Sequence, residues 1–298
     1  MSPTETNVMT FNDYLNRAWQ EHGMDPEKTA ASLEQGLALC TSANDIISLV
    51  HLTTHLYSEH LHKFIEGERK LREFGKSDFV VGSPAEFAIA RSVMAFRLCD
   101  GSIDPEHDRA GLTPGDLARS LAIATSALST RDSMRSEKYL RQALSLVSSL
   151  ELNAKDGIAR GLAIAGNNTA ANLEEFASRT AQQTSLMLLA AETGRKYWEI
   201  AGSWMEVERA EYRWAKSCLE ARFIDDARKH AKLCLAGCEA NHAPALEFFF
   251  AYECLATVEK QARSDAFEAM RGFATEWFEK IGPDDQSWAK ASLEKLRS

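Results

Sequence analysis

Small and apolar residues recur at three- and four-residue spacing along most of the chain, which is the period of helices that bury one face. The clearest example is a pair of runs at residues 207–218 and 225–238. The stretch between them leaves room for only a tight turn, and Asp225 is suited to cap the second helix. The sequence therefore predicts two antiparallel helices joined as a hairpin.

Further runs of the same kind cover the rest of the chain. Toward the N-terminus they predict helices at residues 11–22, 26–40, 44–61, 63–74 and 84–98. Beyond a polar break they predict helices at residues 116–128, 133–150, 157–176, 180–200, 244–261, 264–281 and 286–296. Thr180 and Gln183 have the spacing of a capping box at the start of one of these helices. The pattern thus predicts an all-α fold of about fourteen helices with almost no strand.

The hairpin at residues 207–238 resembles a tetratricopeptide (TPR) repeat. Trp214 and Ala215 match the large and small positions of its first helix, and Ala227, Ala231 and Cys234 match the consensus positions of its second. The segments GNN…LEE and RKYWEIAGSWMEVERAEYR also resemble those of uncharacterised bacterial TPR-like proteins. The resemblance implies a right-handed superhelix (α-solenoid) of helical hairpins with a concave groove, and it implies no reaction.

On this interpretation the chain has three segments. Residues 1–9 are polar and are expected to be a flexible N-terminus. Residues 10–113 are expected to form N-terminal helical hairpins that end in an irregular acidic loop at 100–113. Residues 114–298 are expected to form C-terminal TPR-like repeats, closed by a polar helix at 286–296 that covers the last apolar face.

The TPR register predicts a binding face on the first helices of these repeats. It places Arg209, Tyr212 and Lys216 on the concave side, and it turns Asn167, with Asn168 next to it, toward the groove. Arg195 is a further groove candidate near the end of the helix at 180–200. TPR domains that hold a terminal carboxylate use a Gly-Asn pair with Lys and Arg, a set that this chain matches in part.

Four of these six candidates also have a structural interpretation. Arg209 and Lys216 can form a solvated helix face, paired with glutamates of their own helix. Gly166 and Asn167 are poor helix formers, and close packing of two helices explains them as well as an amide aimed at a ligand does. Arg195 lies near a helix C-terminus, where cations are favoured in any case.

Histidines in the N-terminal half are weak candidates for a metal site. His51, His55, Glu59 and His62 are spaced so that one helical face could present them all. The same spacing is expected of imidazoles that pack or hydrogen-bond across a hairpin. Cys234 and Cys238 stand four residues apart, but no second ligand pair lies near them at the spacing of a zinc site, so we expect them to be packing residues.

Charge and composition narrow the classes of partner. A net charge of −9 over 298 residues argues against nucleic acid or an anionic membrane as a partner. The first ten residues lack the features of a signal peptide, and no run is long enough for a membrane span. The six cysteines are dispersed through helical runs, which is typical of buried thiols in a reducing compartment. We therefore expect a cytoplasmic protein.

The function that fits this pattern is a non-catalytic scaffold that binds a protein or peptide segment in its groove. No phosphate-binding loop, nucleophile elbow or well-spaced zinc signature is present in the sequence, so neither an enzyme nor a cofactor is expected. A ligand-sensing domain for a small molecule or peptide is the alternative, followed by a metal-binding or enzymatic protein. The protein could also form a homo-oligomer.

Overall fold

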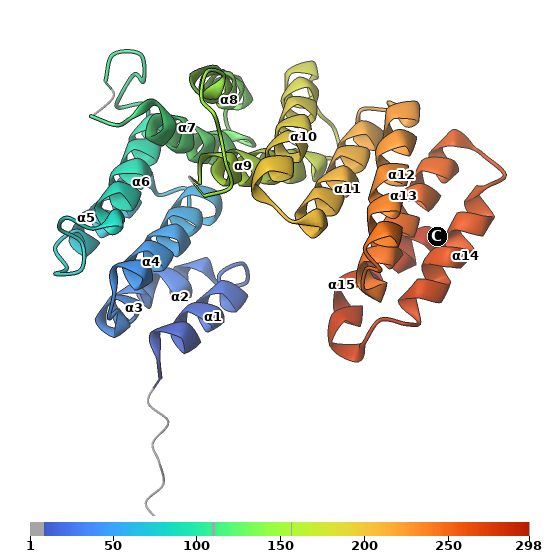
Figure 1. The fold of residues 1–298 in the computed structure, drawn as a ribbon, viewed down its shortest axis with the longest axis horizontal. Helices are drawn as coiled ribbons and strands as arrows, with labels where there is room; N and C mark the ends of the chain where they lie inside the picture. Colours follow the sequence, from blue (N-terminus) through green and yellow to red (C-terminus); the bar gives the residue numbers. More distant parts are fainter. Residues whose placement is uncertain (1–8, 109–110, 156, 298) are drawn as a thin grey trace, which may run out of the picture. The chain divides into compact units, whose positions relative to one another are not determined.

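The protein is all-helical, as the sequence predicts. The structure, a computed structural model, describes residues 9–108, 111–155 and 157–297. These residues form fifteen α-helices and one π-helical turn, and they contain no β-strand (Figure 1). The chain separates into two compact units. The first comprises the described residues up to Leu128 together with Arg141–Val147, and the second comprises Ser129–Leu140 and the described residues from Ser148 onward.

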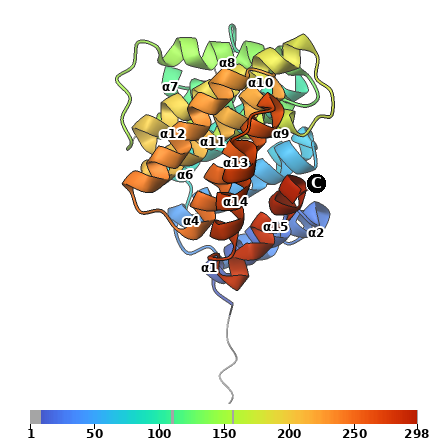
Figure 2. The same cartoon turned by 90° about the vertical axis from the view of Figure 1, so that its right-hand side faces the viewer.

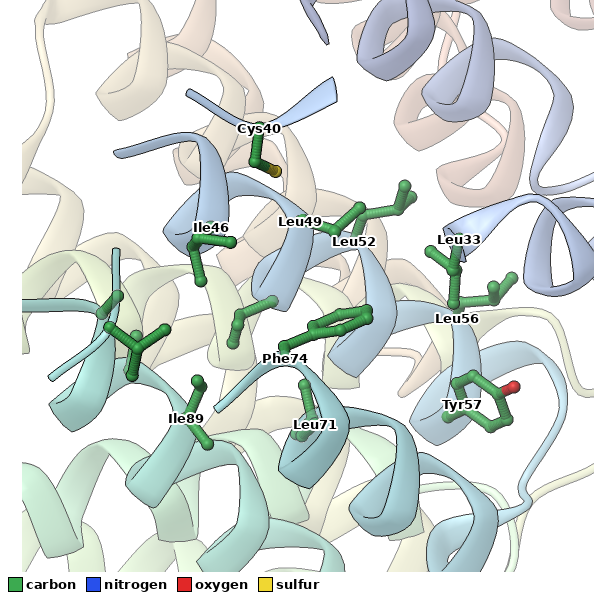
Figure 3. Close-up of a cluster of buried hydrophobic side chains, with 14 of the residues drawn as sticks. Leu33, Cys40, Ile46, Leu49, Leu52, Leu56, Tyr57, Leu71, Phe74 and Ile89 are labelled. Atoms are coloured by element: carbon green, nitrogen blue, oxygen red, sulfur yellow. The ribbon is translucent and has the colours of Figure 1, made fainter. Parts of the chain in front are cut away.

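The first unit is built from short helices around an apolar core. Its helices are α1 (Phe11–Glu21), α2 (Pro26–Ala31), α3 (Leu33–Leu39), α4 (Ala43–His55), the π-helical turn η1 (Leu56–His60), α5 (Phe64–Phe74), α6 (Pro84–Asp100) and α7 (Pro114–Leu128). The division between the units passes through α8 (Ser133–Val147). Leu33, Ile46, Leu52 and Phe74 are fully buried and lie together in the core (Figure 3).

The second unit is a succession of longer helices. These are α9 (Ile158–Glu174), α10 (Ala181–Ala201), α11 (Trp204–Glu220), α12 (Ile224–Ala240), α13 (Ala245–Ala262), α14 (Phe267–Phe278) and α15 (Pro283–Arg297). Each helix packs against the next, and α11, α12 and α13 lie alongside one another in both views (Figures 1 and 2). Alternate helices also contact each other, namely α9 with α11, α11 with α13 and α13 with α15.

Small residues and capping residues fix the geometry of the second unit. A Cβ atom added to Gly166 would lie 2.6 Å from the carbonyl oxygen of Ala190 and 2.6 Å from the amide nitrogen of Gly194. The predicted role of Gly166 at a close helix contact is therefore confirmed for α9 and α10. The capping box of Thr180 and Gln183 is present at the start of α10, and Ser203 with Glu206 forms a second one at the start of α11.

Several predicted boundaries differ from the structure. The run at 26–40 is two helices, because the chain bends at Ser32 between α2 and α3. Asp225 does not cap α12, which begins one residue earlier, and its side chain instead pairs with Arg228 within the first turn. The closing helix begins at Pro283 rather than at residue 286. Residues 1–8 of the predicted N-terminus and residues 109–110 of the predicted loop lie outside the described residues.

Candidate functional site

Helix α11 carries three of the predicted binding residues on one face. Arg209, Tyr212 and Lys216 follow the three- and four-residue spacing that aligns side chains along a helix. All three reach glutamates of the neighbouring α13. Arg209 forms an ion pair with Glu247, and the side chains of Tyr212 and Lys216 both reach Glu253. The prediction that these residues share a face is confirmed. The alternative, in which Arg209 and Lys216 pair with glutamates of their own helix, is wrong, because their partners lie on α13.

The glutamate partners are more buried than the cations they hold. Glu247 is 7% exposed at its side chain, whereas Arg209 is 58% exposed. The hydroxyl of Tyr212 donates to Oε2 of Glu253 at 3.2 Å, and Nζ of Lys216 lies 3.4 Å from Oε1 of the same carboxylate. Burial lowers the pKa of Lys216, but the nearby groups Glu253, Cys254 and Glu174 together outweigh this, so that the net pKa is raised. Burial and the charge of Glu253 raise the pKa of Tyr212 well above its ordinary value.

Helix α11 is tied to α9 in a similar way. Arg213 forms an ion pair with Glu174 at the end of α9, and the hydroxyl of Ser217 donates to the same carboxylate at 2.6 Å. Burial raises the pKa of Glu174 even though Arg213 opposes the shift. Three cations of α11 are therefore matched by three glutamates of α9 and α13. We call the face formed by these residues the polar face: Glu174, Arg209, Tyr212, Arg213, Lys216, Glu247 and Glu253.

Charge balance determines what the polar face can bind. Its cations already have carboxylate partners, so a terminal carboxylate of a ligand would have to displace one of them. The partial match to a carboxylate-binding TPR domain is therefore not accompanied by free positive charge on Arg209 or Lys216. The face can contact a ligand through polar groups without favouring either sign of charge.

Asn167 and Asn168 lie on α9, next to the close contact at Gly166. Both are half-buried, and their side-chain amides form no hydrogen bond with other residues in the part of the chain that the structure describes. An asparagine amide offers two donor hydrogens and an acceptor oxygen. These two side chains are thus the predicted site residues whose hydrogen-bonding capacity remains open to a ligand.

Arg195 belongs to a different cluster. Its guanidinium pairs with Glu199 of its own helix at 3.1 Å and with the buried Glu211 of α11. Nδ1 of His230, on α12, lies 2.6 Å from the other oxygen of Glu211, and the ring of His230 stacks on Trp214 with centroids 3.9 Å apart. Trp214, at the large position of the first helix, thus packs against the second helix of the hairpin. Arg195 connects α10 to α11 and does not pair with the residues of the polar face.

Glu208 is an unusual group that sequence reasoning missed. Its Oε1 accepts from the thiol of Cys234 at 2.7 Å and lies 3.6 Å from Sγ of Cys238. Its Oε2 is buried without a hydrogen-bond partner among the described residues. Burial raises the pKa of Glu208 to about 7, a shift that the negative Glu247 reinforces. Cys234 and Cys238 are packing residues, as expected, and all six cysteines are free and buried.

The predicted histidine set is wrong in two of its three members. His51 is exposed on α4, and neither His51 nor His62 belongs to the group that the structure brings together, which consists of His22, His55 and His60. The prediction failed because it assumed α-helical spacing up to residue 62. Residues 56–60 form a π-helical turn, whose five-residue repeat places His60 beside His55. His22 comes from the end of α1, and no spacing rule relates it to the other two.

Two surface depressions among the described residues are lined by residues other than the predicted binding residues. One of about 450 Å³ is lined by α14 and by Arg297, with Glu268, Arg271 and Glu279 among its residues. Another, of about 150 Å³, is lined by residues of the first unit, including Glu106, Leu121 and Gln142. Neither therefore favours a small-molecule site at the polar face.

Comparison of the chain with protein-family models and with curated proteins finds no match. None of the helices in the described residues combines the length and the apolar character needed to cross a membrane.

Proposed function

We propose that the protein is a non-catalytic, TPR-like scaffold whose second unit binds an extended segment of a partner protein. The observation that carries the proposal is the arrangement of α9, α11 and α13. These alternate helices contact one another and share the polar face, and the amides of Asn167 and Asn168, on the same helix as Glu174, have no partner within the described chain. In this proposal the helical hairpins continue as a right-handed superhelix, and the alternate helices line its concave side.

A regular spacing of ion pairs supports the repeat interpretation. Partners on adjacent alternate helices are separated by 39 residues for Glu174 and Arg213, by 38 for Arg209 and Glu247, and by 37 for Lys216 and Glu253. Two α-helices of 17 residues with short turns, as in α11 and α12, require a comparable separation. Each hairpin therefore holds the next through the same kind of contact, which is what a stack of repeats needs.

The chemistry of the polar face favours recognition of a peptide main chain. A peptide unit offers one N–H donor and one C=O acceptor, and the amide of an asparagine side chain can satisfy both. Because the cations of the face are already paired, a charged ligand group gains little there. We therefore propose that Asn167 and Asn168 hold the backbone of an extended segment and that the neighbouring side chains select its side chains. The free, buried thiols lead us to propose a reducing compartment, the cytoplasm, as its location.

Peptide display against the full chain tests the proposal. Selected peptides are synthesised, and their affinities are measured for the native protein and for Asn167→Ala and Asn168→Ala. We expect each substitution to weaken binding about tenfold, the effect of losing a hydrogen bond of about 1.4 kcal/mol. Asn241→Ala is the matched control, because the Asn241 amide donates to the Gly237 carbonyl at 2.9 Å at the end of α12.

Two outcomes would contradict this function. One is a display experiment that enriches no peptide above background. The other is a set of peptides whose affinity is the same for the native protein, Asn167→Ala and Asn168→Ala. Each peptide is also made with a free and an amidated C-terminus. Dependence on the free carboxylate would show a carboxylate clamp and would overturn recognition of the main chain as the basis of binding.

A further inference from the structure

Three imidazoles meet at one point of the first unit. Nε2 of His55 lies 3.2 Å from Nε2 of His22 and 3.1 Å from Nε2 of His60. The ligand atoms of all three histidines lie within 4.8 Å of one another. His22 follows α1, His55 ends α4 and His60 ends the π-helical turn. Residues from three elements therefore direct the same ring nitrogen toward a common centre.

The second nitrogens of two of these rings determine where their protons lie. Nδ1 of His22 is 2.7 Å from the carbonyl oxygen of Trp19, and Nδ1 of His55 is 3.3 Å from Oε1 of Glu59. A carbonyl and a carboxylate can only accept, so we assign a proton to each Nδ1. In their neutral forms both rings then carry a lone pair on Nε2, and these lone pairs face each other at 3.2 Å.

Two lone pairs at hydrogen-bond distance repel unless a cation lies between them. A hydrogen on Nε2 of His60 can satisfy the contact between His60 and His55, but it leaves the contact between His22 and His55 without a proton. One metal ion satisfies all three nitrogens together. The contacts of the two Nδ1 atoms also match a metal site. Histidine ligands of a metal donate their other N–H to a carbonyl or a carboxylate, as His22 and His55 do.

We propose that His22, His55 and His60 bind one divalent first-row transition metal ion, for which Zn²⁺ is the representative. Zinc is held by histidine nitrogens at about 2.0–2.1 Å, so two ligands of a tetrahedral site lie about 3.3 Å apart. The two short contacts of the cluster, 3.2 and 3.1 Å, are close to that spacing. Three imidazoles at a partly exposed position leave the fourth coordination site for water or a ligand.

The π-helical turn is what creates this site. Its five-residue hydrogen bond joins the amide of Leu61 to the carbonyl of Leu56 at 2.9 Å. An α-helical continuation would have turned His60 away from His55, because five residues span about 500° at 100° per residue, some 140° beyond a full turn. The turn instead brings the two rings to a centroid distance of 4.9 Å. Trp19 packs against His22 and His55, with ring centroids 5.1 and 5.4 Å away.

Metal titration of the full chain, made without a histidine tag and stripped with a chelator, tests the site. Calorimetry with Zn²⁺ is expected to show one equivalent bound per chain. Titration with Co²⁺ is expected to give the visible absorption of a tetrahedral complex. His22→Ala and His55→Ala are expected to weaken binding at least 100-fold. Glu59→Gln, which keeps all three ligands, is expected to weaken it 10- to 100-fold, the usual effect of losing the outer partner of a metal-bound histidine.

His51→Ala is the matched control, because His51 lies on the same helix one turn before His55, is exposed and is not part of the cluster. It is expected to bind Zn²⁺ like the native chain. Circular dichroism establishes that each variant is folded, and the conservative Glu59→Gln keeps the test decisive if an alanine variant is not. The proposal is overturned if the native chain binds no stoichiometric Zn²⁺, or if His51→Ala loses as much affinity as His55→Ala.

Discussion

The two compact units differ in what they bury. The largest fully buried side chains of the first unit are apolar or aromatic, including Tyr14, Leu52 and Phe74. The second unit also has an apolar core, but its buried positions include five glutamates. Among the described residues, all the buried glutamates belong to α11 and α13: Glu208, Glu211, Glu247, Glu253 and Glu259.

The difference shows two ways of specifying which helix packs against which. In the first unit the shapes of large apolar side chains determine the fit, and ion pairs such as Lys28–Glu21 and Lys63–Glu27 lie at the surface. In the second unit most of the buried carboxylates pair with a cation from a neighbouring helix. A buried charge without its partner is costly, so a helix placed in the wrong order would leave several carboxylates unpaired. The polar contacts thus favour one order of the helices.

Glu211→Ala tests the polar side of this comparison and is expected to have the largest effect. The substitution leaves the buried His230 and the guanidinium of Arg195 without their shared carboxylate. We expect the free energy of unfolding to fall by about 3–5 kcal/mol, the usual cost of breaking a buried pair. Glu199→Ala is the control, because Glu199 also pairs with Arg195 but is 70% exposed. Its cost should be about 0–1 kcal/mol in urea unfolding. Equal costs for the two variants would show that the buried carboxylate contributes no more to stability than the exposed one.

Phe74→Ala tests the apolar side. Phe74 is fully buried in the core of the first unit (Figure 3). Its truncation is expected to cost about 3–5 kcal/mol through lost burial and the cavity left behind. Lys63→Ala in the same unit should cost far less, because its ion pair with Glu27 is exposed to solvent. If urea unfolding gave a larger loss for Lys63→Ala, the first unit would depend on polar contacts as the second does.

Glu208→Gln tests how a buried carboxylate without a cation partner makes stability depend on pH. The pKa of Glu208 is raised from 4.5 to about 7, chiefly by burial. Because the folded state then binds the proton more tightly than the unfolded state, this group lowers stability progressively as the pH rises from 4.5 through 7. At about 1.4 kcal/mol per pKa unit, the loss approaches about 3 kcal/mol at pH 8. The variant should be increasingly more stable than the native chain across this range in thermal or urea unfolding, and a pH-independent difference would contradict the assignment.

Gly166→Ala is expected to have the smallest effect of the four. The added methyl group would meet the backbone of α10 at 2.6 Å, and backbone atoms cannot rotate away as a side chain does. Overpacking of this kind costs about 1–3 kcal/mol. Gly272→Ala is the matched control within α14, because a Cβ atom there meets nothing within 4 Å. It should instead stabilise the protein by up to about 1 kcal/mol. A stabilising effect at both positions would show that α9 and α10 can separate.

Periodic apolar positions and local capping signals were sufficient to predict most helices. The runs that became α1, α6, α9 and α10 were predicted to within a few residues, because helix formation depends on contacts between residues three or four apart. The break at Ser32 and the π-helical turn at Leu56–His60 were missed. The apolar spacing along these segments is compatible with an uninterrupted α-helix, and only packing against other helices selects the local change.

Some features of the candidate sites could likewise be predicted from the sequence, and others are visible only in the tertiary structure. The sequence by itself determined the helices, the shared face of Arg209, Tyr212 and Lys216, and the small residue at the contact of Gly166, all of which follow from the period of a helix. Only the tertiary structure decided that α13 supplies the carboxylates for that face and that His22 joins His55 and His60. Those partners lie 33 to 41 residues apart along the chain. Pairing over such distances depends on how helices stack, and no local pattern encodes it.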